Sequence, residues 1–313
     1  MGEFDLIARY FLRPCHDAAL GVGDDCALLG PLAEGMQWAV STDMLVAGRH
    51  FLPHVDPQAL GHKALAVNLS DLAAMGARPR AFTLALALPD IDESWLADFA
   101  EGMWALANQH GCELIGGDTT RGPLNICITV FGEVPAQLAL RRSAAKAGDD
   151  VWVSGTLGDA AWALAQLQAS RPVSADARAR LERPTPRIEL GLRLRTLAHA
   201  CMDVSDGLAG DLRHILKASH LGAAVDLDAL PLSDELLALP LDLQRKLALS
   251  GGDDYELLLT APVHHRSALA TLAEELNTPL TRIGSMTTEQ GLRWLSAGQA
   301  VNLSLRGYDH FSP

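Results

Sequence analysis

The spacing of apolar positions changes along the chain between a helical repeat and the alternation typical of strands. Stretches rich in Ala and Leu are followed by short runs of Val, Ile and Leu, a pattern that predicts a mixed α/β protein. In the first half we expect helices at 3–12, 57–75 and 93–110, and strands at 38–41, 82–88, 113–115 and 125–134. In the second half we expect strands at 151–154, 255–261, near 283 and at 292–295, and helices after 159, at 207–219 and at 264–276.

Capping residues and a change of composition set the boundaries. Asp56 and Pro57 form an N-cap and N1 pair, while Gly76 and Gly111 follow the last residues of two helices. A polar segment at 135–150 separates the two halves. Because 313 residues exceed the usual size of one domain, we expect a domain at 1–138 and a second at 139–313.

Charge and cysteine usage narrow the classes of function. The net charge is −13 and no cluster of Lys and Arg stands out, which argues against nucleic acid or an anionic membrane as partner. The five cysteines are far apart and never form a CxxC pair, so we expect reduced thiols rather than disulfides or a zinc site. The charged N-terminus is unlike a signal peptide, and no apolar run is long enough for a bilayer. We therefore expect a cytoplasmic protein.

Six short acidic motifs are scattered along the chain without a lysine-bearing phosphate loop. They are Gly23-Asp24-Asp25, Ser41-Thr42-Asp43, Asn68-Leu69-Ser70-Asp71, Gly116-Gly117-Asp118-Thr119-Thr120, Met202-Asp203-Val204-Ser205-Asp206-Gly207 and Gly251-Gly252-Asp253-Asp254-Tyr255-Glu256. Gathered carboxylates repel one another unless cations hold them, and Mg²⁺ takes one or two carboxylates and fills its other positions with water and substrate phosphates. The motifs therefore indicate a metal-dependent enzyme that acts on phosphates.

Each motif taken singly has a structural alternative. Asp206 is placed to cap the helix that follows it, and Asp24 and Asp25 fit a plain turn. Arg142 is either a solvated residue of the connecting segment or a phosphate clamp. His50 is either a packed histidine or a substrate contact. The residues themselves leave these alternatives open.

For other motifs, their expected position at a strand end or on a helix face favours a ligand-binding role over a purely structural one. Thr42-Asp43 and Gly117-Asp118 are expected where buried strands end, which is the usual place of ligand sites in α/β folds. Asp71 falls on an apolar helix face, where a carboxylate is costly without a cation or donor. The turn at 155–159 suits either a phosphate or an ordinary strand-turn-helix connection. The GxxxxGK[ST], GxGxxG and GxSxG signatures are missing, which disfavours P-loop, Rossmann and α/β-hydrolase enzymes.

Longer segments carry these motifs in a fixed order: GVGDDCA at 21–27, STDMLVAGRHF at 41–51, KALAVNLSDLAAMGA at 63–77, GGDTT at 116–120, DVSDGL at 203–208, GGDDYEL at 251–257 and GYDHF at 307–311. Over essentially the whole chain this set resembles the thiamine-monophosphate kinases, which belong with the aminoimidazole ribonucleotide synthetases. The resemblance implies a two-domain α/β (α+β) fold, with an N-terminal α/β domain that dimerises through its sheet and a C-terminal α+β domain. It also implies ATP-dependent phosphorylation of thiamine monophosphate to thiamine diphosphate, the last step in making that cofactor.

The resemblance also implies roles for residues at the matching positions. Those that would bind several Mg²⁺ ions are Asp25, Ser41, Thr42, Asp43, Asp71, Asp118, Asp203 and Asp206. Those that would contact ATP are Gly117, Asp118, Arg142 and Ser205. Those that would contact thiamine monophosphate are His50, Asp253 and Tyr308. Asp253 stands where the family often has Glu. Leu305 stands where some relatives have Trp, so aromatic stacking on thiamine would fall to Tyr308 or be absent.

Physical chemistry agrees with direct transfer between the two substrates. Two anions must approach each other, and Mg²⁺ ions offset their charge and bridge their phosphates. A phosphate acceptor is already ionised at neutral pH, so no strong base and no covalent nucleophile are required.

Two other classes of function fit the same motifs. One is another ATP-using enzyme of the superfamily that makes an acyl phosphate, an iminophosphate or a selenophosphate. The other is a metal-binding regulatory protein without turnover, which would release no ADP from ATP.

Overall fold

The structure is a computed structural model, and it describes residues 3–14, 18–20 and 28–303. The chain divides into two compact units. Unit 1 comprises Met1–Leu72 and Ala77–Gln137, and unit 2 comprises Ala73–Gly76 and Leu138–Pro313. Asp25, Leu305 and Tyr308 lie outside the described residues, as do Cys15 and Cys26.

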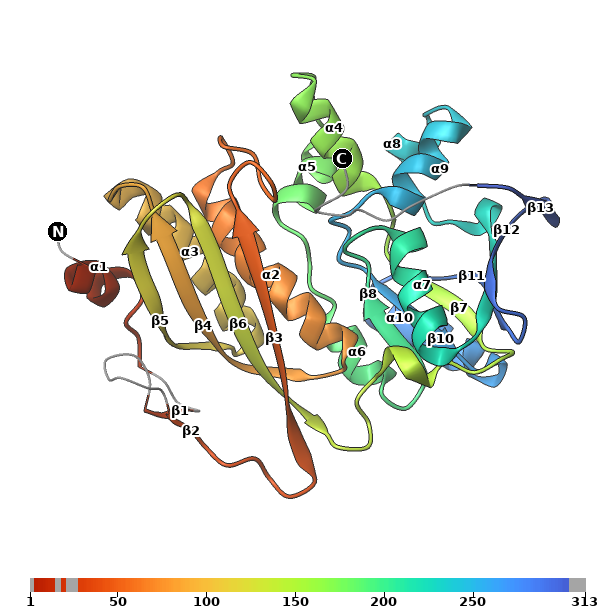
Figure 1. Ribbon diagram of the computed structural model, residues 1–313, viewed down its shortest axis with the longest axis horizontal. Coiled ribbons are helices and arrows are strands. Elements are labelled where there is room, and N and C mark those ends of the chain that lie inside the picture. The colour runs from red at the N-terminus through yellow and green to blue at the C-terminus, as the bar shows by residue number, and fades with distance from the viewer. Residues whose placement is uncertain (1–2, 15–17, 21–27, 304–313) are drawn as a thin grey trace. The chain divides into compact units, whose positions relative to one another are not determined.

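Unit 1 is built on a four-stranded sheet in the order β3-β6-β4-β5 (Figure 1). Its strands are β3 Met36–Val46, β4 Arg78–Leu88, β5 Glu113–Arg121 and β6 Asn125–Pro135. β6 pairs antiparallel with both β3 and β4, whereas β5 runs parallel to β4 after the crossover through α3. A short hairpin, β1 Ala18–Leu20 with β2 Leu28–Leu29, precedes the sheet.

Helices cover one face of this sheet. They are α2 Pro57–Ala74 and α3 Glu93–His110, with the short α1 Glu3–Tyr10 beside them (Figure 1). Asp56 Oδ1 accepts a hydrogen bond from Ala59 N at 2.8 Å, which confirms the predicted cap of α2. Gly111 ends α3 in the left-handed conformation at φ 60°, also as predicted.

The opposite face of the sheet is open along β3. The alternation of β3 turns Ser41, Asp43 and Leu45 toward the helices and leaves Val40 and Met44 on the other side. Val40 is 56% exposed and Met44 52% exposed. Toward β5 the same face is partly covered, because Leu29 and Phe131 pack there on Ala81 and Ile115.

Unit 2 contains a seven-stranded sheet in the order β13-β12-β9-β11-β7-β10-β8. The strands are β7 Asp150–Ser154, β8 Ala200–Asp203, β9 Gly222–Asp226, β10 Leu257–Ala261, β11 Leu280–Thr287, β12 Gly291–Ser296 and β13 Gln299–Val301. The α-helices are α4 Asp159–Gln168, α5 Ala175–Glu182, α6 Ile188–Leu194, α7 Leu208–Ser219, α8 Asp234–Leu237, α9 Leu241–Ser250 and α10 Arg266–Glu275. Short 3₁₀ turns are η1 Arg142–Ala144, η2 Leu227–Ala229 and η3 Val263–His265.

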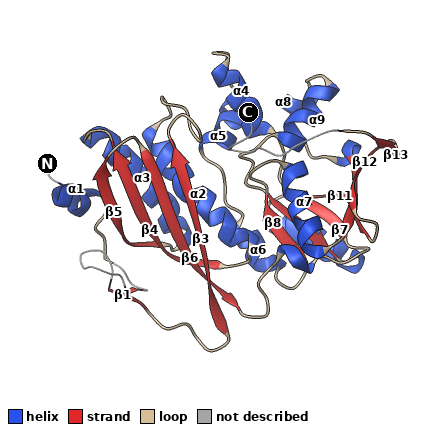
Figure 2. Ribbon diagram, viewed as in Figure 1, coloured by secondary structure: helices blue, strands red, loops and turns tan. Residues whose placement is uncertain are grey.

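The central strands of unit 2 are buried on both faces. Every residue of β7, β8 and β10 is buried, so helices must cover both sides of the sheet. Leu212 and Ile215 of α7 form one core cluster with Val153 and Leu258. The helix α7 therefore packs on the sheet of unit 2, whose helices and strands are distinguished in Figure 2. The predicted mixed α/β class is confirmed.

Two predicted strand ends are wrong. β3 continues past Thr42 and Asp43 to Val46, and β5 continues through the Gly-Gly-Asp motif to Arg121. The reason is cross-strand pairing, since β6 pairs with β3 along its whole length and β4 pairs with β5 as far as Arg121. The acidic motifs of unit 1 therefore lie within strands. The sequence also missed β1, β2, α6, β8, β9, α8, α9 and β13.

No helix among residues 3–14, 18–20 and 28–303 has both the length and the apolar character needed to cross a membrane.

Candidate functional site

The first group of predicted site residues meets between β3 and α2 in unit 1. Ser41 Oγ donates a hydrogen bond to Asp71 Oδ2. Asn68 Oδ1 accepts a hydrogen bond from Asp43 N at 3.0 Å, while its Nδ2 donates to Ala64 O one helical turn earlier. Strand alternation and the helical repeat together bring Ser41, Asp43 and Asp71 to one place, which spacing along the sequence could not establish.

Thr42 lies on the other face of the sheet. Its Oγ1 is 2.8 Å from Thr129 Oγ1 on β6, and its side chain is exposed. Because neighbouring residues of a strand point to opposite faces, the Thr42 side chain cannot join Ser41 and Asp43. Any contact of Thr42 with an ion bound there must come from its backbone carbonyl.

Gly117 and Asp118 occupy the edge strand β5. The register aligns Asp43, Ile128, Leu84 and Gly117 in one row across the sheet, with Asp118 one residue further along. Gly117 has φ 149°, and a Cβ atom there would lie 1.8 Å from Leu84 O. Only glycine allows β5 to approach β4 this closely. Asp118 is exposed beside this contact.

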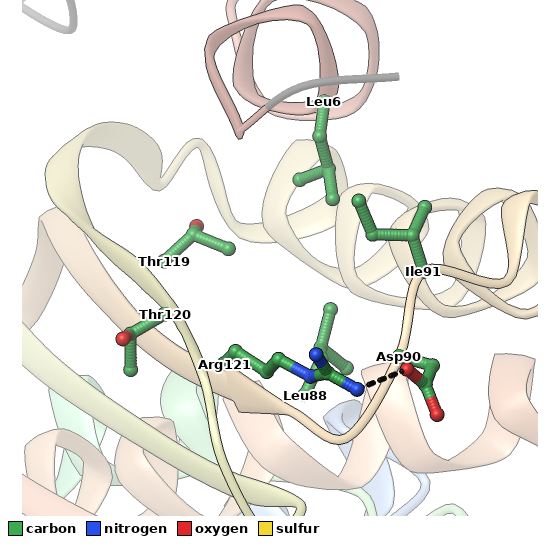
Figure 3. A pocket seen from close by; sticks show the side chains of 7 residues that line it. All are labelled: Leu6, Leu88, Asp90, Ile91, Thr119, Thr120 and Arg121. Atoms are coloured by element: carbon green, nitrogen blue, oxygen red, sulfur yellow. Dashed lines mark hydrogen bonds and ion pairs between the residues drawn. The ribbon is translucent and has the colours of Figure 1, made fainter.

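A cavity of about 380 Å³ lies beside the last residues of β4 and β5 (Figure 3). Its lining residues are Leu6, Leu88, Asp90, Ile91, Thr119, Thr120 and Arg121. Arg121 Nη2 lies 2.9 Å from Asp90 Oδ1 at its rim, and both side chains are largely exposed. The cavity combines an apolar wall with the hydroxyls that follow Gly117 and Asp118.

His50 lies in the turn after β3. Its Nδ1 accepts a hydrogen bond from Val46 N at 3.0 Å, and its side chain is partly buried. This bond fixes the ring locally and assigns the proton of neutral His50 to Nε2. Both the packed and the substrate-contacting interpretation remain compatible with this geometry.

The second group of predicted residues meets in unit 2, beyond the ends of β8 and β10. Asp203, the last residue of β8, pairs in register with Leu257. Past the strands the pairing continues through Val204 N to Glu256 O at 2.8 Å, Tyr255 N to Val204 O at 2.8 Å and Asp253 N to Ser205 O at 2.9 Å. The Asp203–Asp206 and Gly251–Glu256 motifs therefore lie side by side.

Asp211 of α7 holds the loop that follows Asp203. Its Oδ2 accepts hydrogen bonds from Ser205 N and Asp206 N, both at 3.1 Å. The pKa of Asp211 is raised to about 7, mainly by burial and next by the Asp206 carboxylate, while the hydrogen bonds from Asp206 N and Ser205 N and the charge of Arg142 act in the opposite direction. The guanidinium of Arg142 is thus within electrostatic reach of the loop. The sequence carried a signal for this residue, a lone Asp on the apolar face of a helix.

Two structural alternatives are resolved in unit 2. Asp206 is not the N-cap residue of α7, because Gly207 occupies that position. The turn at 155–159 is structural, since Gly158 N donates to both carboxylate oxygens of Asp254, at 2.9 and 3.0 Å. An internal carboxylate occupies the position that a phosphate would take.

The donors present suit hard cations. Ser41, Asp43 and Asp71 offer oxygen atoms on one face of unit 1, and Asp203 and Asp206 offer them in unit 2. Within the described ranges, no three His, Cys, Asp or Glu side chains gather into a ready metal site. Mg²⁺ is a hard cation that takes one or two carboxylates and completes its octahedral shell with water and substrate phosphates. Of the cysteines in these ranges, Cys112, Cys127 and Cys201 are free thiols.

Known proteins match the chain over nearly its full length. The AIR synthase related protein family is matched by its N-terminal domain at residues 23–134 and by its C-terminal domain at residues 146–294. The thiamine-monophosphate kinase of Salmonella typhimurium is 51% identical to this chain over an alignment of 321 residues, which covers 99% of this chain and 98% of the relative.

Solved structures agree. The crystal structure of thiamine-monophosphate kinase from Stenotrophomonas maltophilia has a TM-score of 0.85 and 51% identity, covering 91% of this chain and 92% of that one. The structure of AaThiL complexed with AMPPCP and TMP has a TM-score of 0.79 and 30% identity, covering 90% of each chain.

Proposed function

This chain belongs to the thiamine-monophosphate kinase family, and on that basis we propose that it transfers the γ-phosphoryl group of ATP to thiamine monophosphate, giving thiamine diphosphate and ADP. The observation that carries the proposal is the 51% identity over 99% of the chain, combined with the grouping of the predicted acidic residues in each unit. A structural relative at 30% identity is complexed with AMPPCP and TMP, a nucleotide analogue and a substrate of this same kind.

Magnesium is the metal that this chemistry requires. Asp43, Asp71 and Ser41 would hold Mg²⁺ in unit 1, with the backbone of Thr42. Asp118 belongs to the predicted set, but the register aligns it with Ala85, Cys127 and Met44, in the row that faces the opposite side of the sheet. Asp203 and Asp206 would hold Mg²⁺ in unit 2, and Asp25 belongs to the same predicted set. When bound, the ions would offset the negative charge of the phosphates. Two side chains hold the backbone next to these ligands in place. Asn68 accepts a hydrogen bond from Asp43 N, and Asp211 accepts hydrogen bonds from Ser205 N and Asp206 N.

ATP contacts follow from the same geometry. Gly117 would contact the triphosphate through its backbone, and the exposed Arg142 would supply a guanidinium for phosphate oxygens. Ser205 presents its hydroxyl beside Asp206. We place the nucleoside end of ATP in the cavity next to β5, because its apolar wall suits a purine and Thr119 and Thr120 suit a ribose.

Thiamine monophosphate would be contacted by His50, Asp253 and Tyr308. Asp253 is held beside Ser205 and accepts a hydrogen bond from Tyr255 Oη at 3.0 Å. Transfer is direct, because a phosphate acceptor needs no deprotonation and bound metals can align both substrates. Stable label on the protein after incubation with γ-labelled ATP alone would contradict this.

We further propose that residues 1–138 form the ATP- and Mg²⁺-binding domain and that two copies of it pair through the open face of the sheet. Val40 and Met44 are exposed on that face, and burying them against a second copy would remove apolar surface from water. Residues 139–313 form the second domain of each copy.

The activity is tested by incubating the protein with ATP, Mg²⁺ and thiamine monophosphate and separating the products by chromatography. We expect thiamine diphosphate and ADP in equal amounts. Asp43→Asn and Asp71→Asn should each abolish turnover without unfolding the protein, whereas Glu289→Gln, an exposed carboxylate paired with Arg293, should retain it. Normal turnover in either Asp variant would remove the metal argument, and no thiamine diphosphate from the unaltered protein would remove the proposed function.

A further inference from the structure

The Asp253–Glu256 segment leads from an accessible residue into the core. Asp254 and Glu256 are completely buried and Tyr255 is nearly so, whereas Asp253 is partly exposed. Asp253 and Tyr255 both have positive φ values, 68° and 50°, which side-chain-bearing residues seldom adopt. Backbone of this kind is strained and persists only where the surrounding structure enforces it.

Two arginines from outside the segment hold it in this conformation through Glu256. Arg187, which precedes α6, donates from Nε to Glu256 Oε2 at 2.7 Å and from Nη2 to Oε1 at 2.6 Å. Arg180 of α5 adds a contact from Nη2 to Glu256 Oε1 at 2.8 Å, and the same nitrogen reaches Asp254 O at 3.2 Å. A bidentate arginine fixes a carboxylate in orientation as well as in position.

The carboxylate of Glu256 is also held from the sheet. Ser154 Oγ donates to Glu256 Oε2 at 2.5 Å and accepts from Leu257 N at 2.8 Å. Glu256 lies so close to Gly155 that a Cβ atom there would meet Oε1 at 2.1 Å. These contacts hold the Glu256 carboxylate in one position. The backbone of the neighbouring residues is constrained as a result.

We propose that Arg187, supported by Arg180, is a positioning residue for the phosphate-acceptor substrate, because its grip on Glu256 holds Asp253 and Tyr255 in the left-handed conformation that presents the Asp253 carboxylate. This rests on the proposed role of Asp253 as a contact of thiamine monophosphate. Arg187 touches no substrate; it acts through Glu256 and the backbone. The 18% exposure of its side chain fits that indirect role.

A second arginine of the same unit offers a matched control. Arg266 binds Asp150 with the same bidentate geometry, at 2.6 and 2.7 Å. Asp150 begins β7 and Ser154 ends it, so the two ion pairs lie at opposite ends of one strand. Loss of either arginine removes a bidentate pair from the sheet, and only loss of Arg187 should alter the Asp253 segment.

The experiment compares Arg187→Lys, Arg187→Met and Arg266→Met. For Arg187→Lys we expect the KM for thiamine monophosphate to rise about tenfold or more, while the KM for ATP changes about twofold at most. Hydrogen exchange in the 251–258 peptide should accelerate, because the amides of Asp253 and Tyr255 lose their enforced bonds to Ser205 and Val204. Arg266→Met should show neither effect.

The outcomes separate this inference from the proposed function. An unchanged KM for thiamine monophosphate and unchanged exchange in Arg187→Lys would overturn the inference, as would an equal change in Arg266→Met. If Arg187→Met fails to fold, Arg187→Lys decides alone. If the unaltered protein makes no thiamine diphosphate, the proposed function fails, and the exchange measurement still tests the grip of Arg187 on the segment.

Discussion

Replacing Gly117 with Ala places a methyl group where β5 has no room for one. The added Cβ would lie 1.8 Å from Leu84 O and 2.6 Å from Leu84 C. A carbon and a carbonyl oxygen normally approach no closer than about 3.3 Å, so β5 must move about 1.5 Å away from β4. The φ value of 149° adds strain that any side chain would bring.

The two contributions can be sized separately. A non-glycine residue in so sparsely populated a backbone conformation costs about 1–3 kcal/mol. Forcing a methyl group into filled space costs about 1–3 kcal/mol more. Because β5 is an edge strand and can shift outward, we expect the lower half of the combined range, about 3 kcal/mol. Against a typical stability of about 5–15 kcal/mol, the variant should still fold.

The neighbouring glycine is the control. A Cβ at Gly116 would meet only Thr83 Cγ2, at the ordinary contact distance of 3.9 Å. Urea unfolding followed by circular dichroism should show Gly117→Ala to be less stable than Gly116→Ala by about 3 kcal/mol. Affinity for ATP, measured by calorimetry, should fall in Gly117→Ala more than in Gly116→Ala. Equal stabilities, within about 0.5 kcal/mol, would refute the steric argument.

Three further predictions test other parts of the molecule. Arg142→Ala should raise the KM for ATP, lower kcat, or both, and unchanged ATP kinetics would return Arg142 to a solvated linker residue. Sedimentation should show that the protein is a dimer and that Val40→Glu dissociates it. The control Leu237→Glu changes an equally exposed residue of unit 2 and should leave the dimer intact. An active monomer near 33.4 kDa would refute the dimer. The pKa of Asp211, about 7, lies above its unfolded value of 3.8, so its protonation favours folding: the stability it contributes is complete below pH 4 and is lost as the pH rises through 7. We therefore compare how the free energy of unfolding changes between pH 4 and 7 in the absence of metal. It should fall more steeply in the unaltered protein than in Asp211→Asn, by up to about 1.4 kcal/mol per pH unit. Parallel pH profiles of the two proteins would contradict this.

Local capping chemistry made some elements predictable from sequence. The limits of α3 match the predicted residues 93–110, and α2 begins at the predicted Pro57, because each helix has its cap written into a few adjacent residues. Strand limits depended on partners distant in sequence. The residues around Asp43 and Gly117 carry no sequence signal that they pair with β6 and β4.

The sequence proposed candidate residues for the site but not their geometry. The acidic motifs pointed to Asp43 and Asp71 as candidates, but only the packing of α2 on β3 brings Asp71 to Ser41. The roles of Asp211 and Arg187 could not be read from short motifs, because each acts on a backbone segment through burial and hydrogen bonds. Asp25 and Tyr308 lie outside the described residues, so their assignments stay predictions.

The alternation of β3 ties its length to its chemistry. Deleting or inserting one residue before Ser41 would exchange the two faces of the strand, sending Val40 and Met44 toward the helices and Asp43 to the open side. Substitutions on one face can be repaired singly, whereas a change of length damages both faces at once. Related chains should therefore vary in length in the loops that flank β3 and keep the spacing within it constant.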